Sequence, residues 1–79
     1  GVFSMSEKLG RSLRIALARK GFKAAKMARD MGVSAQKMSQ AKAGQVKGVA
    51  FYERAAEVLG MKFSEFVVLG EDDCCNNHN

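Results

Sequence analysis

The hydrophobic residues of the chain fall into five groups, and within each group they recur every three or four positions. This spacing places them on one side of a helix. Glycines, which commonly end helices, stand between or after the groups: Gly21, Gly32, Gly44, Gly60 and Gly70. The pattern predicts five helices, at about residues 6–20, 24–31, 35–42, 49–59 and 63–69.

Helices this short cannot each bury a face alone, so they are expected to share one core. The expected core is Leu9, Leu13, Leu17, Phe22, Met27, Ala28, Met31, Val33, Met38, Val49, Tyr52, Ala56, Leu59, Phe63 and Phe66. No run alternates with period two for long enough to indicate a strand. The sequence therefore predicts an all-α fold, a compact five-helix domain over residues 6–70.

Both ends of the chain are expected to lie outside this domain. Residues 1–4 are typical of a vector remnant, since Met5 followed by Ser6 resembles a natural start. Residues 71–79 are polar and follow a glycine, which predicts a disordered tail. Cys74, Cys75 and His78 offer three metal ligands there, one short of a closed zinc site, so no metal is expected.

Charge divides the chain into a basic and an acidic part. Residues 1–47 hold eleven of the thirteen Lys and Arg residues and two acidic residues, whereas residues 48–79 hold six acidic residues. This asymmetry favours a polyanion as partner, although a solvated basic surface would look similar. No apolar run approaches membrane-spanning length and no signal peptide is evident, so a cytoplasmic protein is expected.

The residues around Gly32 have the layout of a helix-turn-helix. Gly32 can adopt the positive φ needed to turn the chain sharply after a helix. Val33 can fill the elbow between the two helices, and Ser34 can cap the second one. Ala28 is small enough for close approach, and Met38 can complete the same local core.

With these features the chain resembles the lambda-repressor-like (Cro/cI-type) helix-turn-helix family of bacterial and phage regulators. The resemblance extends without insertion or deletion over Leu9–Gly70 and is carried by Gly21-Phe22, Met27-Ala28, Met31-Gly32-Val33-Ser34, Met38-Ser39, Leu59-Gly60 and Phe63-Ser64-Glu65-Phe66. The family usually has a capping Ser or Thr and then Gln at the second helix, where this chain has Lys23 and Ala24. The proline usual after the third helix is also absent.

The resemblance implies that bases are read by the helix beginning after Ser34, from Ala35, Gln36, Ser39 and Gln40. Gln36 and Gln40 lie one turn apart on the same face, and a glutamine amide can bind adenine at N6 and N7. Ala35 could offer only a methyl contact to thymine. The alternative is that these glutamines are solvated surface residues.

Phosphate contacts are expected from polar and basic residues in or beside the motif: Lys23, Lys26, Ser34, Lys37, Lys42 and Lys47. Three arginines of the first helix, Arg11, Arg14 and Arg19, could serve either phosphate contact or solvation.

These residues together predict a phage-type transcription regulator that occupies a double-stranded DNA operator as a homodimer, with Val49–Leu69 as the expected interface. No cofactor, membrane or small-molecule substrate is expected. The chain is not expected to be an enzyme, because no plausible catalytic cluster or phosphate-binding glycine loop is present. The competing hypothesis is a protein-interaction module of the same fold, antitoxin-like or an anti-repressor, that does not read DNA.

Overall fold

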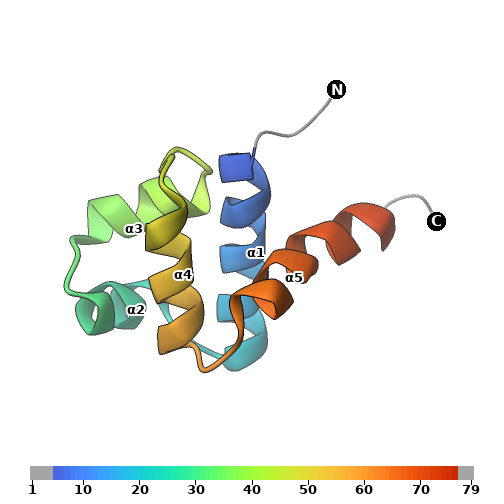
Figure 1. The fold of residues 1–79 in the computed structure, drawn as a ribbon. Coiled ribbons are helices and arrows are strands. Elements are labelled where there is room, and N and C mark those ends of the chain that lie inside the picture. Colours follow the sequence, from blue (N-terminus) through green and yellow to red (C-terminus); the bar gives the residue numbers. More distant parts are fainter. Residues whose placement is uncertain (1–4, 77–79) are drawn as a thin grey trace.

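The computed structural model describes the backbone of residues 5–76 and the side chains of residues 5–71. This part of the chain contains five helices and no strand: α1 (Met5–Lys20), α2 (Ala24–Met31), α3 (Ala35–Lys42), α4 (Val49–Val58) and α5 (Phe63–Asn76) (Figure 1). The all-α five-helix fold predicted from the sequence is therefore confirmed. The bounds of α2 and α3 agree with the prediction, because a glycine and a serine mark the turn between them.

The five helices enclose one core, with α1 at the centre of the arrangement (Figure 1). α1 packs against α3, α4 and α5, while α2 packs against α3 and α4. The contact of α1 with α5 is the most extensive of these. The helix-turn-helix formed by α2 and α3 thus lies at one end of the molecule and α5 at the other (Figure 1).

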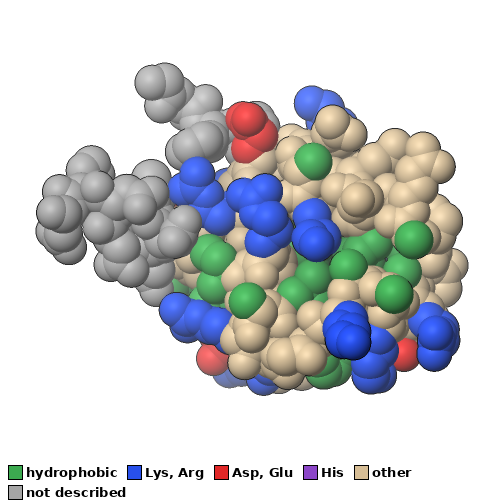
Figure 2. Space-filling model, turned by 180° about the vertical axis from the view of Figure 1, so that it is seen from behind, with side chains coloured by type: hydrophobic (Ala, Val, Ile, Leu, Met, Phe, Trp, Pro, Cys, Tyr) green, Lys and Arg blue, Asp and Glu red, His purple; other side chains and the backbone are tan. Residues whose placement is uncertain are grey.

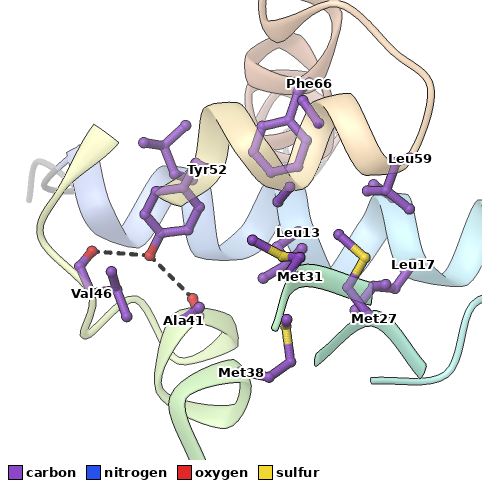
Figure 3. Packing of buried hydrophobic residues seen from close by; sticks show 14 of the residues in the cluster. Leu13, Leu17, Met27, Met31, Met38, Ala41, Val46, Tyr52, Leu59 and Phe66 are labelled. Carbon is purple, nitrogen blue, oxygen red and sulfur yellow. Dashed lines mark hydrogen bonds between the residues drawn. The ribbon is translucent and has the colours of Figure 1, made fainter. Parts of the chain in front are cut away.

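Most of the expected core residues are buried, and side chains of all five helices meet in the interior (Figure 3). Phe22, Val33 and Phe63 are only half-buried and pack against the edge of this core. Val49 is 41% exposed, so its assignment to the core is wrong. It begins α4 at the edge of the core, whereas Val46 in the preceding loop is buried.

The fifth helix is longer than predicted, because Gly70 does not end it. α5 continues through Asn76 instead of ending near residue 69. Gly70 lies where α5 crosses α1: a Cβ there would stand 2.6 Å from Ser12 Oγ and 2.7 Å from the carbonyl oxygen of Lys8. The Gly70 N–H donates to Ser12 Oγ at 2.9 Å. The glycine therefore permits a close helix crossing, and the prediction that it ends the fifth helix is wrong.

A second close approach joins α1 to the end of α3. A Cβ on Gly10 would stand 2.7 Å from the carbonyl oxygen of Ala41 and 2.8 Å from the nitrogen of Gly44. Gly44 has φ +81° and would itself bring a Cβ within 2.8 Å of the Cα of Glu7. Because backbone meets backbone here, the distance between α1 and the carboxyl end of α3 is fixed.

Candidate nucleic-acid interface

The turn between α2 and α3 is built by three consecutive residues, as the sequence predicted. Gly32 has φ 71° and ψ 30°, the left-handed conformation that ends α2. The Val33 N–H donates to the carbonyl of Ala28 at 2.9 Å, which closes the turn. Ser34 is extended, and its Oγ accepts a hydrogen bond from the N–H of Lys37 at 3.1 Å. The N-cap predicted for α3 is therefore confirmed.

α3 presents different residues to the core and to solvent. Met38 and Ala41 are fully buried, and Met38 lies below Met27 and Met31 of α2 (Figure 3). Of the residues expected to contact bases, Ala35, Gln36 and Ser39 are exposed, and Gln40 is half-buried. The structure thus brings these residues to the outer side of one short helix, whose polar side chains are available to a partner.

Most of the residues expected to contact phosphate are also accessible. Exposed residues are Lys23, Lys26, Ser34, Lys37 and Lys47, while Lys42 is half-buried. Lys23 is the N-cap of α2, and its side chain makes no capping hydrogen bond. Lys23 therefore does not provide the side-chain cap that a Ser or Thr can give at this position.

Two of these lysines have partners within the protein. The Nζ of Lys26 lies 3.1 Å from Asp30 Oδ2, one turn further along α2, and 5.2 Å from the centre of the Phe22 ring. The Nζ of Lys37 lies 5.8 Å from the centre of the Phe51 ring on α4. A cation over an aromatic face and an exposed ion pair one helical turn apart are both weak contacts, so both ammonium groups remain available at the surface.

The carboxyl end of α3 is anchored by side chains that the sequence analysis did not single out for this role. The Tyr52 hydroxyl, which has one proton to donate, lies 3.0 Å from the carbonyl oxygen of Val46 and 3.3 Å from that of Ala41 (Figure 3). Arg14 Nη1 donates to the carbonyl of Lys42 at 2.8 Å. Burial raises the pKa of the Tyr52 hydroxyl above its ordinary value of 10.0. No spacing in the sequence identifies such contacts, because they join a side chain to a backbone carbonyl in another helix or in a loop.

The end of α2 is anchored in a similar way. Arg54 Nη2 on α4 donates to the carbonyl of Met31 at 3.3 Å. The last carbonyls of a helix lack partners within that helix and carry partial negative charge, so an arginine there is favourable. α1 and α4 therefore hold the two helices of the helix-turn-helix at their carboxyl ends.

One face of the molecule carries many basic side chains (Figure 2). Figure 2 shows Lys and Arg side chains across one face of the molecule, with few acidic side chains among them. Among the described residues, no three His, Cys, Asp or Glu side chains gather in a way that could hold a metal ion. The side chains of Cys74, Cys75 and His78 lie outside the described residues. No helix in the described part is long and apolar enough to cross a membrane.

No protein-family model matches the chain, and no match is found among curated protein sequences. Among solved structures, the chain is similar to the clp gene regulator ClgR from Corynebacterium glutamicum, with a TM-score of 0.82 and 19% sequence identity. The similarity covers 96% of this chain and 82% of the ClgR chain. At this identity the comparison establishes the fold: the five helices, with α2 and α3 as a helix-turn-helix, are arranged as in a gene regulator.

Proposed function

We propose that this protein is a sequence-specific, double-stranded DNA-binding transcription regulator that reads its operator with α3. The observation that carries the proposal is the exposed polar side of α3, presented by a capped turn and flanked by lysines. The shared fold with a clp gene regulator supports the same function. The resemblance of the sequence to Cro/cI regulators favours a phage-type repressor that acts by occupying the operator in the cytoplasm.

In this proposal Gln36 is the principal base-reading residue. It is exposed in the first turn of α3, the end that enters the major groove in this motif. Its amide can match the donor and acceptor of adenine, while Ser39 and Gln40 lie further along the same helix. Ala35 contributes at most a methyl contact to thymine.

The exposed lysines position the protein by phosphate contacts. Lys23 is the N-cap residue just before α2, and Lys26 lies on α2. Lys37 and Lys42 lie on α3, and Lys47 lies in the loop that follows. Ser34 has its hydroxyl engaged at the cap of α3, so its phosphate contact in this proposal uses the remaining capacity of that hydroxyl. A protein-interaction module would instead be expected to expose apolar residues on α3, where this chain exposes glutamine, serine and lysine.

The proposal is tested first by selecting bound sites from random DNA with the full chain. A DNA reader is expected to enrich one short motif, and its retention on DNA resin is expected to fall steeply with salt. Recovery of no common motif would exclude sequence-specific reading.

The selected operator then tests Gln36 directly. Gln36→Ala is expected to cost about 1–3 kcal/mol on the operator, to leave scrambled DNA nearly unaffected and to relax preference at one base pair per half-site. Gln45→Ala is the matched control, because Gln45 is an exposed glutamine just beyond α3. Equal losses on operator and scrambled duplex for Gln36→Ala would show that Gln36 does not read sequence.

A further inference from the structure

The carboxyl end of α3 is held by a charged side chain from another helix. Arg14 of α1 donates from Nη1 to the carbonyl oxygen of Lys42, the last residue of α3, at 2.8 Å. This carbonyl belongs to the last turn, where no later residue of the helix provides a donor. The guanidinium also lies at the negative end of the helix dipole, which strengthens the contact.

Because of its position on α1, this contact helps to fix the orientation of α3. Gly10 lies one turn before Arg14 on the same side of α1, and its backbone is in closest contact with Ala41 and Gly44. Two successive turns of α1 therefore fix the end of α3, the first through backbone contact and the second through a hydrogen bond. Because α3 has only eight residues, fixing its carboxyl end also sets the direction of the end that carries Gln36.

We propose that Arg14 is a positioning residue for operator reading, which orients α3 instead of neutralising a DNA phosphate. This inference rests on the proposed function, and it assigns a role to a side chain for which the sequence left phosphate contact and solvation open. A contact that holds α3 in one orientation is expected to raise affinity for the operator, because side chains must meet base edges there at a fixed angle. The same contact is expected to change affinity for random DNA little, because phosphate contacts tolerate small rotations of α3.

The first measurement uses the free protein. The N–H groups of Ala43, Gly44 and Gln45 donate to α3 carbonyls, so their hydrogen exchange reports opening of this end of the helix. Arg14→Gln is expected to raise their exchange about fivefold, the effect of losing one hydrogen bond, while the amides of α5 keep their rates. Arg19→Gln, an equal loss of charge in the exposed last turn of α1, is expected to leave all these rates unchanged. Unchanged exchange at Ala43–Gln45 in Arg14→Gln would overturn the proposal.

The second measurement uses the selected operator and a scrambled duplex at several salt concentrations. Arg14→Gln is expected to weaken operator binding about fivefold, to change scrambled binding less than about twofold and to leave the salt slope unchanged. Arg14→Lys, which keeps a cationic donor, is expected to recover most of the operator affinity. Equal weakening on both duplexes with a salt slope reduced by about one would identify a phosphate contact and overturn the proposal.

The two measurements separate this inference from the proposed function. A wild-type protein that distinguishes no operator from scrambled DNA would refute the proposed function and with it the reading role of Arg14. The exchange rates of the free protein would still decide whether Arg14 holds α3. An operator that is read normally by Arg14→Gln would refute the inference alone.

Discussion

Replacing Tyr52 with phenylalanine isolates the contribution of one buried hydroxyl. The Tyr52 side chain is fully buried, and its ring packs edge-on to Phe51 at 5.5 Å and against Phe66 at 6.4 Å between ring centres. Phenylalanine fills nearly the same space, so these ring contacts are expected to persist. The single O–H, which the carbonyls of Val46 and Ala41 share, is lost.

The expected loss of stability depends on which hydrogen-bond partners the two carbonyls keep. The carbonyl of Ala41 also accepts from the Gly44 N–H at 3.0 Å, so it keeps a partner when the hydroxyl is removed. The carbonyl of Val46 loses the closer contact, 3.0 Å, from a buried hydroxyl. One lost hydrogen bond with a poorly solvated acceptor costs about 1–2 kcal/mol. For a domain of this size, that lowers Tm by about 5–15 °C.

Thermal unfolding followed by circular dichroism measures this loss. Ser39→Ala is a suitable control, because it removes a hydroxyl from the exposed side of α3 and is expected to leave Tm nearly unchanged. Relative to the wild type, amide exchange in Tyr52→Phe should also rise more in the loop of residues 43–48 than in α5. If Tyr52→Phe melts at the wild-type temperature, the hydroxyl does not anchor the end of α3.

Three further predictions concern charge, protonation and assembly. Lys37→Ala is expected to weaken binding to operator and to random DNA alike and to reduce the salt slope by about one. Lys62→Ala, a change at an exposed position just before α5, is expected to alter neither the affinity nor the salt slope. Because folding raises the pKa of Tyr52, the unfolded chain loses that proton first, so stability should fall as pH rises above 10.0. Tyr52 is the only tyrosine, so tyrosinate absorbance reports its titration alone. Titration like that of free tyrosine would contradict the prediction, as would an equal fall in stability with pH in Tyr52→Phe. The protein is also expected to bind as a homodimer to half-sites about 10 bp apart, and one chain per duplex at saturation would exclude that.

The sequence predicted the helix-turn-helix well because its determinants are local. Gly32 and Ser34 each act on neighbouring backbone groups, so their effects can be inferred from residue type and spacing. The prediction that Gly70 ends a helix is wrong because a glycine that ends a helix and one that lets two helices touch look alike in a sequence. The spacing of hydrophobic residues places Val49 on the core-facing side of its helix. It does not indicate that the neighbouring helices leave this end of the helix uncovered.

The role of Arg14 could not be predicted for a related reason. Its partner is a backbone carbonyl 28 residues away, and carbonyl groups have no signature in a sequence. The same holds for the two carbonyls that share the Tyr52 hydroxyl. The residues expected to contact bases follow from the family resemblance and from their position on α3. Their accessibility, though not their contacts, follows from the structure.

The division of α3 into an inner and an outer side has a consequence for how such a protein can diverge. Its buried side chains are only Met38 and Ala41, while its ends are fixed by Ser34 and by side chains from α1 and α4. Exposed substitutions away from such anchors usually change stability little. The outer side of α3 can therefore be rewritten with little penalty in folding, and a duplicated copy could acquire a different target while it keeps the same scaffold.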